Sequence, residues 1–372
     1  MKWIATCPHE TVDVLASELY SLGVKDQKKL HRGIAFDADL ETAYRAHLLL
    51  RTASRIQRVV AEFDASDNSA LKAGLREIVW PEWLRSHRPF AVAPALTDPK
   101  ALALGEAAVT GAVVESVQDG AFEKGVPKFD PDYDNPITIV PFIRNGECVL
   151  GIDTAGRALH KRGWRTNGHP AVLKETLAAS ILLSAGYNGS EPLLDPMCGS
   201  GTIVIEAAYI ALHKAPLIHR GKDDFSLEHL AGFDRPLWRK VSDQLRAAKL
   251  SELPAPIFAS DIQPKYVELA RASALRARVE KYIRFAVLPF QECEPPASSG
   301  LLIANLPYGE RIGAGGIEKL YRDAGKVISE RFPKWRIALL VPEDAPVHLL
   351  GLKSPKTVSL LNGSLPVKLL LA

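Results

Sequence analysis

The chain has 372 residues, of which 47% are hydrophobic and 24% charged, and its formal net charge is +3 at pH 7. This length predicts about two or three domains, and the hydrophobic fraction excludes a chain that is mainly disordered. We expect neither a transmembrane helix nor a secretory signal, because no run approaches about 18 uncharged apolar residues and charged side chains already occur in the first ten positions.

The first 60 residues alternate between strand-like and helix-like segments. The expected elements are a strand at 3–6, a helix at 10–22, a strand at 33–36 and a helix at 40–50. So short an alternation predicts a ferredoxin-like α+β unit over residues 1–60.

Residues 61–158 continue the mixed pattern. The expected elements are a helix at 70–79 capped by Ser69, a strand at 90–95, one helix at 99–117, and strands at 137–144 and 148–153. The pair Asn145-Gly146 between the last two strands predicts a tight hairpin, because both residues tolerate positive φ. The basic, glycine-containing segment 159–170 is the expected junction between the main domains.

Residues 171–372 contain longer strand–helix units. Helices are expected at 174–185, 202–212, 264–278 and 316–331, and strands at 193–195, 256–261, 301–305, 336–341, 357–361 and 366–371. Parallel strands joined by helices and followed by a final hairpin predict a doubly wound, Rossmann-like α/β sheet with an antiparallel edge.

A glycine-rich turn follows the apolar strand at 193–195 and reads DPMCGSGT over 195–202. Its two glycines allow the backbone to approach a ligand closely, and the helix that begins there offers free N–H groups. An acid at the strand's end can meet a cationic or hydroxyl-bearing ligand. We assign cofactor binding here to Asp195, Pro196, Cys198, Gly199, Ser200, Gly201 and Thr202.

A dinucleotide is the alternative ligand for this turn, since its fingerprint is G-x-G-x-x-G. Val204 occupies the third glycine position, and no basic residue lies nearby to hold a pyrophosphate. The turn therefore favours a ligand with an ammonium group and an adenosine, which is S-adenosylmethionine.

Asp261, followed by Ile262, ends the next expected strand. An acid at this place suits the two hydroxyls of a ribose, although by itself it would equally suit the N-cap of the following helix. The long gap from Asp195 requires an insertion at about 215–250, which would either help to grip a substrate or cover the edge of the sheet.

A third segment, NLPYGER at 305–311, follows the apolar strand at 301–304. An amine nucleophile needs acceptors that orient its hydrogens and its lone pair. Asn305 supplies a side-chain carbonyl, Pro307 stiffens the loop, and Tyr308 offers a flat face for stacking a base. At a strand end this loop would lie opposite the cofactor turn.

Taken in order, DPMCGSGT, SDI and NLPYGER resemble class I S-adenosylmethionine-dependent methyltransferases that act on exocyclic amines. The segments LHKRGWR at 159–165 and LKETLAA at 173–179 resemble the junction of THUMP-domain RNA guanine-N2 methyltransferases. The resemblance implies a THUMP RNA-binding domain at 61–158 and a methyltransferase domain at 171–372. It further implies S-adenosylmethionine as cofactor and methylation of guanine N2, in 23S rRNA more than in tRNA.

By this resemblance, Asn305 and the carbonyl of Pro307 would accept hydrogen bonds from the guanine amine, and Tyr308 would stack on the base. The family's motif is usually NPPY, and Leu306 departs from it. Many relatives carry an acid just before a phenylalanine near the adenine. Here a proline takes that place, so we expect Phe290 to pack on the ring and Gln291 to be a replacement partner.

RNA contact is predicted from local clusters of positive charge. Within the junction, phosphate contacts and stacking are assigned to Lys161, Arg162, Trp164 and Arg165, beside His160. A second basic run spans 25–32, and Arg51, Arg55 and Arg58 would share a helical face if the helix at 40–50 extended that far.

Two other functions stay open. An adenine-N6 nucleic-acid methyltransferase would use a similar substrate loop, and a cofactor-binding RNA chaperone would bind without catalysis. The four cysteines form no Cys-x-x-Cys pair, which predicts neither a disulfide framework nor a metal site and favours reduced thiols in the cytoplasm. We expect RNA as the partner and no membrane contact.

Overall fold

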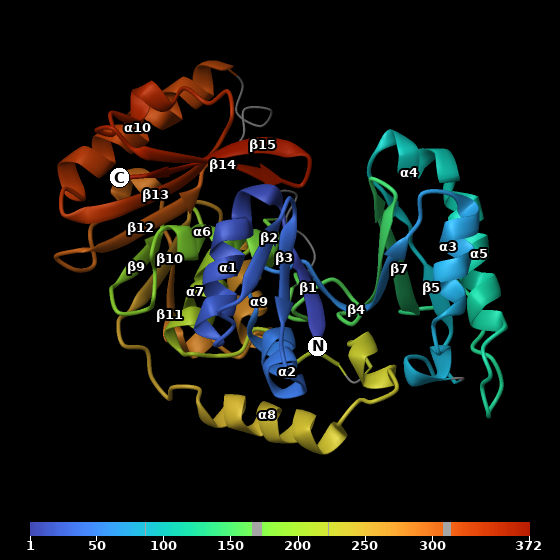
Figure 1. Cartoon of the computed structure of the whole chain (residues 1–372). Helices are drawn as coiled ribbons and strands as arrows, with labels where there is room; N and C mark the ends of the chain where they lie inside the picture. Colours follow the sequence, from blue (N-terminus) through green and yellow to red (C-terminus); the bar gives the residue numbers. More distant parts are fainter. Residues whose placement is uncertain (86, 166–172, 222, 308–313) are drawn as a thin grey trace.

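The computed structural model describes residues 1–85, 87–165, 173–221, 223–307 and 314–372, and it contains two β-sheets (Figure 1). The N-terminal sheet has eight strands in the order β2-β3-β1-β4-β8-β7-β5, with β6 paired to β7. The C-terminal sheet has seven, in the order β11-β10-β9-β12-β13-β15-β14. No helix of the described ranges is long and apolar enough to cross a membrane.

The N-terminal sheet joins the two expected N-terminal units into one continuous layer. Its strands are β1 (Lys2–Thr6), β2 (Gln27–Leu30), β3 (Gly33–Asp37), β4 (Arg55–Asp64), β5 (Phe90–Val92), β6 (Ala95–Leu96), β7 (Ile137–Arg144) and β8 (Glu147–Asp153). The long strand β4 pairs with β1 on one side and β8 on the other. The boundary expected at residue 60 therefore falls inside a strand.

Helices cover one face of this sheet and leave the other face open. They are α1 (Val12–Ser21), α2 (Leu40–Leu49), α3 (Asn68–Arg76), α4 (Pro99–Leu104) and α5 (Glu106–Gln118). Because side chains alternate along a strand, Trp3 and Ile56 enter the core beneath α1 and α2, whereas Ile4 and Arg55 line a cleft on the open face.

Local expectations in this half are largely confirmed, with three corrections. The hairpin at Asn145-Gly146 forms, with both residues at positive φ. The expected helix at 99–117 is two helices, because Gly105 at φ 80° separates them. Asp67, rather than Ser69, caps α3 and accepts a hydrogen bond from the amide of Ala70 at 2.8 Å.

The third correction concerns basic residues. Arg55 and Arg58 lie on the strand β4 and not on a helix with Arg51, because α2 ends at Leu49. The basic run at 25–32 contains the edge strand β2, which the sequence analysis did not find. Lysines are typical of such edges, where charge discourages pairing with another chain.

The C-terminal sheet is doubly wound, as expected. Its strands are β9 (Leu193–Asp195), β10 (Ile257–Asp261), β11 (Ile283–Val287), β12 (Gly300–Asn305), β13 (Trp335–Pro342), β14 (Lys356–Asn362) and β15 (Leu365–Leu371). Its helices are α6 (Glu175–Ser184), α7 (Thr202–Ala211), α8 (Arg235–Ala247), α9 (Pro264–Arg276) and α10 (Ala314–Arg331). The strands from β11 to β13 are parallel, and β15 is antiparallel to β13 and β14.

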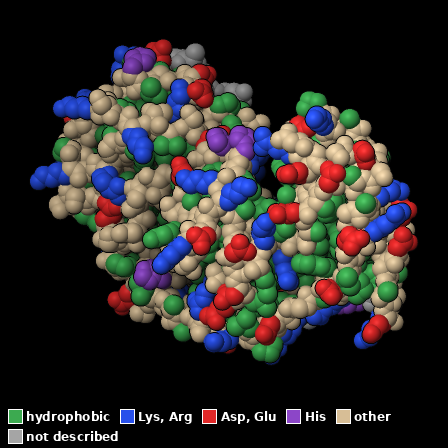
Figure 2. Space-filling model, viewed as in Figure 1, with side chains coloured by type: hydrophobic (Ala, Val, Ile, Leu, Met, Phe, Trp, Pro, Cys, Tyr) green, Lys and Arg blue, Asp and Glu red, His purple; other side chains and the backbone are tan. Residues whose placement is uncertain are grey.

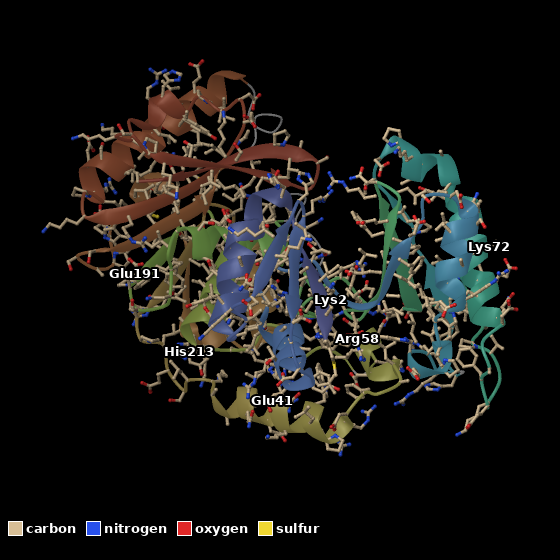
Figure 3. The ribbon with its side chains drawn as sticks, in the orientation of Figure 1. Lys2, Glu41, Arg58, Lys72, Glu191 and His213 are labelled. Atoms are coloured by element: carbon tan, nitrogen blue, oxygen red, sulfur yellow. The ribbon has the colours of Figure 1, made fainter. Side chains whose placement is uncertain are left out.

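The segment at 215–250 packs mainly against the N-terminal unit, and none of its described residues lines the cleft. Its helix α8 contacts α2, where Trp238 meets the ring of Tyr44 edge-on. The amide of Asp234 donates to the Tyr44 hydroxyl at 2.9 Å. Figure 3 shows Glu41 on α2 above α8. The Nζ atom of Lys240 on α8 lies 3.9 Å from the carboxylate of Glu41. The segment thus fastens the two halves of the molecule together.

Candidate active site

Three polar side chains end neighbouring parallel strands of the C-terminal sheet. Asp261 ends β10, Asp195 ends β9 and Asn305 ends β12, and these strands are adjacent in the order β10-β9-β12. The chain's winding reverses between β9 and β12, because the later strands add on the other side of β9. Open α/β sheets bind ligands at such a reversal, beyond the carboxyl ends of their strands.

The glycine-rich turn between β9 and α7 is held against the end of β10. The amide of Cys198 donates to the carbonyl of Ser260 at 2.9 Å, and the amide of Gly199 donates to Asp261 Oδ2 at 3.1 Å. Gly201 adopts the left-handed conformation at φ 78°, and a Cβ there would lie 2.9 Å from the Cβ of Ala270. Glycine is therefore required both for the turn and for the close packing on α9.

The remaining polar groups of the turn lie at the start of α7. Ser200 and Thr202 are both buried, and their hydroxyl oxygens lie 3.2 Å apart. Cys198 is also buried, which raises the pKa of its thiol well above the ordinary value. Its thiol is thus a packing group at neutral pH and not a reactive thiolate. Pro196, next to Asp195, begins the turn.

Asp195 is a buried carboxylic acid beside a second acid. Its Oδ1 accepts a hydrogen bond from the amide of Met197 at 3.1 Å, and the residue is 1% exposed. Burial, with a smaller contribution from Asp261, raises the pKa of Asp195 to about 8. A nearby positive charge would favour the ionised form, so the site suits a ligand that carries a cation.

Asp261 is not the N-cap of α9, a position that Gln263 occupies. Its carboxylate accepts from the amides of Gly199 and Gln263, the latter at 2.9 Å, and thereby joins the turn to β10. Two apolar side chains next to it are exposed to solvent: Ile262 by 61% and Val287 by 53%. Val287 ends β11 opposite Asp261, and the sequence analysis missed it.

The structure corrects the expectation for Phe290. This side chain is 3% exposed and packs in a core cluster with Leu194, Leu302 and Leu306. It therefore presents almost no ring surface to a ligand, and the flat apolar surface near Asp261 is that of Ile262 and Val287. Gln291 is exposed beside it.

The loop that was predicted to bind the substrate begins where β12 ends, at Asn305. Asn305 and Pro307 are partly exposed, and Leu306 between them is fully buried, with its amide donating to the carbonyl of Leu340 at 3.0 Å. The leucine in this motif position thus anchors the loop in the core. Tyr308 lies outside the described residues.

The junction residues are mostly structural, which corrects their assignment to RNA. Arg162 is fully buried and pairs with Glu206 at 3.2 Å, and Trp164 is 2% exposed in the C-terminal core. Arg165 pairs with buried Glu175 at 2.9 Å. Only Lys161 of the four is exposed to solvent. Arg162 joins the two halves of the protein through the carbonyl of Arg51, and Trp164 and Arg165 pack within the C-terminal half.

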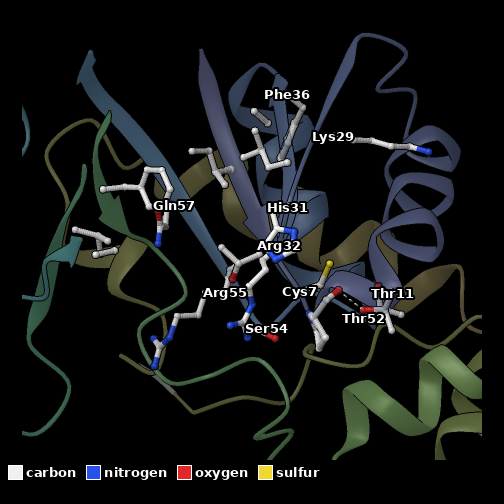
Figure 4. A pocket seen from close by; sticks show the side chains of 18 of the residues that line it. Cys7, Thr11, Lys29, His31, Arg32, Phe36, Thr52, Ser54, Arg55 and Gln57 are labelled. Carbon is white, nitrogen blue, oxygen red and sulfur yellow. Dashed lines mark hydrogen bonds between the residues drawn. The ribbon is translucent and has the colours of Figure 1, made fainter. Parts of the chain in front are cut away.

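A basic cleft of about 1530 Å³ lies between the open face of the N-terminal sheet and the C-terminal domain (Figures 2 and 4). Its lining includes Lys28, Arg32, Arg144 and Lys174, all exposed to solvent. Lys2, Lys29 and Arg55 also line it, and each forms an ion pair with an acid. The sequence pointed to the run at 25–32, Arg55 and His160, but not to Lys2, Arg144 and Lys174, which converge on the cleft through the tertiary fold.

The cleft opens at the same edge as the three strand-end residues. The helix α6 ends beside Arg336, whose guanidinium donates to the carbonyl of Ala185 near the amino ends of the strands. The first turn of α6 therefore lies at the carboxyl edge, and its residues Lys174, Thr176 and Leu177 line the cleft. Among the described residues no group of His, Cys, Asp or Glu has metal-binding geometry.

The fold and the site together define a class I methyltransferase fold, with a glycine-rich turn after the first strand and an acid at the end of the next. The comparisons agree. Residues 162–370 match the family described as RMKL-like, methyltransferase domain, and residues 2–57 match the RlmL ferredoxin-like domain. The chain belongs to this RMKL-like methyltransferase family.

Individual relatives extend the comparison over the whole chain. "Ribosomal RNA large subunit methyltransferase K/L" of Aliivibrio fischeri is 32% identical over 98% of this chain and 52% of its own length. The chain thus spans about half the length of the curated relatives it matches. The crystal structure of SMU.472 complexed with SAH has a TM-score of 0.88 and 28% identity, covering 100% of this chain and 97% of that one.

One solved neighbour carries a different name. A "predicted N6-adenine-specific DNA methylase" from Listeria monocytogenes has a TM-score of 0.85 and 28% identity, covering 100% of this chain and 95% of that one. The relatives' names therefore differ in the nucleic acid that they give, which is ribosomal RNA for the Aliivibrio protein and DNA for the Listeria protein.

Proposed function

We propose that this protein transfers a methyl group from S-adenosylmethionine to the exocyclic N2 amine of guanine in large-subunit ribosomal RNA. The observation that carries the proposal is the pair of acids at the carboxyl edge of the sheet. Asp195 is buried, with no cationic hydrogen-bond partner among the described residues, and burial raises its pKa, so a cationic ligand would stabilise its ionised form. Asp261 accepts a hydrogen bond from the glycine turn. The name of the Aliivibrio relative supports the choice of RNA, and the SAH bound by SMU.472 is what S-adenosylmethionine becomes after giving up its methyl.

The residues present fit this cofactor. Asp195 would face its cationic end, Asp261 would accept hydrogen bonds from the ribose hydroxyls, and Ile262 with Val287 would pack on the adenine. The free amides at the start of α7 lie behind the glycine turn, where the backbone can approach a ligand closely. S-adenosylmethionine supplies an electrophilic methyl group on a sulfonium centre.

The chain's contribution to the reaction is the positioning of the amine. Asn305 ends β12 next to β9, so its side-chain carbonyl would accept a hydrogen bond from the guanine amine beside the cofactor turn. The Pro307 carbonyl would accept the other and turn the nitrogen lone pair toward the methyl group, while Tyr308 would stack on the base. Holding two reactants in line accounts for most of the rate in such a transfer.

The basic cleft would carry the RNA. Phosphate contacts supply most of the affinity of proteins for nucleic acids, and Lys28, Arg32, Arg144 and Lys174 line the cleft from several separate elements. A guanine within a helix cannot reach the strand ends while stacked, so the target base would be extruded. A ribosomal RNA substrate would place the protein in the bacterial cytoplasm.

Adenine N6 in DNA is the second candidate target, favoured by the name of the Listeria neighbour. The test incubates the protein and tritiated S-adenosylmethionine with 23S rRNA, tRNA and DNA, then identifies the methylated nucleoside by mass spectrometry. N2-methylguanosine in 23S rRNA would support the proposal. N6-methyladenosine would support the alternative, and RNA binding without methyl transfer would support a non-catalytic RNA chaperone.

A further inference from the structure

The β14–β15 hairpin projects beyond the edge where the active site lies. Pro342 at the end of β13 pairs with Val367, and β13 pairs through Leu340 with Asn305. The hairpin continues past that point and pairs with itself as far as Asn362 and Leu365. The last pair of the hairpin, Asn362 with Leu365, is two residues beyond Val367, which at about 3.4 Å per residue places it about 7 Å beyond the end of β13, with the turn at Gly363 beyond that.

The tip of this hairpin reaches the basic cleft. Leu361 and Gly363 line the cleft together with Arg32 and Lys174, and β14 also contacts the short helix at 9–11 of the N-terminal unit. Figure 1 shows the hairpin, in red, extending above β2 and β3. The tip is therefore a part of the C-terminal sheet that overhangs the proposed path of the RNA.

The tip has an exposed leucine on each of its faces. Opposed residues of an antiparallel pair share a face, so Leu361 lies with Pro366 on one side and Leu365 lies with Asn362 on the other. Leu361 is 41% exposed and Leu365 is 53% exposed. Between Lys356 and Lys368 the chain carries no charged residue, although basic side chains line the cleft beside it.

An uncharged projection with an exposed leucine on each face suits the flat faces of bases and not phosphates. Proteins that kink or open a duplex insert such side chains between base steps and so stabilise the unstacked form. We propose that the tip at residues 361–366 inserts beside the target guanine and contacts the neighbouring bases while that guanine occupies the active site. This inference rests on the proposed function, because it requires a structured nucleic acid in the cleft.

The first experiment compares a paired and an opened substrate. The variant Leu361→Ser/Leu365→Ser changes two exposed side chains, and Leu275→Ser, at a 68% exposed leucine on α9, is the matched control. Single-turnover methylation is measured on the rRNA stem that carries the methylated guanine and on the same target strand without its complement. We expect a loss of about tenfold on the stem and less than about twofold on the open strand, since unstacking costs a few kcal/mol.

An equal loss of rate on both RNAs, or no loss on the stem, would overturn the proposal that the tip inserts beside the target guanine. Fluorescence of 2-aminopurine beside the target guanine gives a second reading, which should rise on binding of the wild-type protein and of Leu275→Ser but not of the double variant. A rise with the double variant would also count against the proposal.

A photocrosslinking experiment separates failure of this inference from failure of the proposed function. The substitution Leu361→p-benzoylphenylalanine, and the same change at Leu275, are irradiated with total bacterial RNA. A crosslink to RNA from position 361 alone supports contact with bases even if no guanine N2 is methylated. A crosslink to a second copy of this chain, or none to RNA, would reject it.

Discussion

At the scale of single residues, Asp261 connects the two halves of the cofactor site. Its carboxylate accepts hydrogen bonds from the amides of Gly199 and Gln263, so this side chain helps to hold the glycine turn against β10, beside the hydrogen bond from the Cys198 amide to the Ser260 carbonyl. An acid in this position holds the glycine turn and, in the proposed site, would offer acceptors to a ribose, so its removal should reduce cofactor affinity.

Replacing Asp261 with alanine should weaken S-adenosylmethionine binding by about ten- to a hundredfold, because a hydrogen bond to a charged acceptor is worth about 1.5–3 kcal/mol. Titration calorimetry measures the effect. Asp243→Ala, at an exposed acid on α8, serves as the control and should leave affinity unchanged. Equal affinities in all three folded proteins would remove Asp261 from the cofactor site.

The pKa of Asp195 predicts a proton linkage. With a pKa of about 8 in the free protein, this carboxyl is largely protonated at pH 7, and a bound cation would favour its ionised form. Binding should therefore release protons at pH 7 and tighten as pH rises from about 6 to 8. Calorimetry at pH 7 in buffers of different ionisation enthalpy reports the proton release, and Asp195→Asn should abolish it.

The same shift predicts how stability depends on pH. The folded state holds a proton on Asp195 that the unfolded chain releases near pH 4, so stability falls as pH rises from about 4 to 8. The melting temperature of Asp195→Asn relative to wild type should increase over that range. A constant difference between the two proteins would mean that Asp195 is ionised when folded.

Asn305→Ala should reduce the rate of methyl transfer while leaving cofactor affinity nearly unchanged, because Asn305 ends β12 and not the strand that carries Asp261. Misplacing a reacting group by about 1 Å costs on the order of 100-fold. Single-turnover kinetics at saturating RNA gives the rate, and binding assays on the same protein give the affinities. A rate close to that of the wild type would exclude Asn305 from the reaction.

At the scale of elements, the turn from β9 into α7 depends on Gly201 for two separate reasons. Positive φ disfavours any side chain, and the close approach of Ala270 leaves no room for a Cβ. Gly232 has almost the same φ, +74°, but no atom lies within 4 Å of its added Cβ. Comparing substitutions at the two glycines therefore distinguishes the cost of the left-handed backbone from the cost of steric overlap with Ala270.

Gly232→Ala should cost about 1–2 kcal/mol of unfolding free energy from the left-handed backbone alone, and Gly201→Ala should cost clearly more. Urea denaturation followed by circular dichroism measures both. Only Gly201→Ala should also lower S-adenosylmethionine affinity, since it displaces the turn from α9. An equal loss of unfolding free energy in the two variants would show that α9 shifts without cost to accommodate the added Cβ.

At the scale of the whole molecule, buried charges and apolar contacts hold the N-terminal unit on the C-terminal domain. Arg162 donates to the carbonyl of Arg51 at 2.6 Å, and Arg51 in turn donates to the carbonyl of Lys214 at 2.9 Å. The insertion at 215–250 shares one hydrophobic core with α1 and α2. A fragment that began near residue 166 would expose this core to solvent, so RNA-binding experiments should use the intact chain.

Arg162→Met should destabilise the protein by about 3–5 kcal/mol, because it leaves the Glu206 charge buried and uncompensated. The double variant Arg162→Met/Glu206→Leu should recover much of that loss. Thermal and urea unfolding give the values, with Arg246→Met of an exposed ion pair as a control that costs less than about 1 kcal/mol. No difference between the single and double variants would exclude the pair as the cause.

The sequence by itself determined the features that depend on neighbours along the chain. The hairpin at Asn145-Gly146 and the glycine turn with Asp195 and Asp261 at strand ends were predictable. Most strands and helices after residue 170 were predictable as well, although β11 and α8 were not predicted. Local backbone preferences and hydrophobic periodicity act over a few residues, so they are visible without the fold.

Only the tertiary structure decided which charged and apolar groups are buried. Arg162 and Trp164 read as a basic, aromatic RNA contact in the sequence, yet Arg162 is buried where the two halves meet and Trp164 is buried in the C-terminal core. Lys174 and Arg144 line one cleft although they are far apart along the chain. Burial and convergence arise from contacts between distant segments, and a residue's type and sequence neighbours do not contain that information.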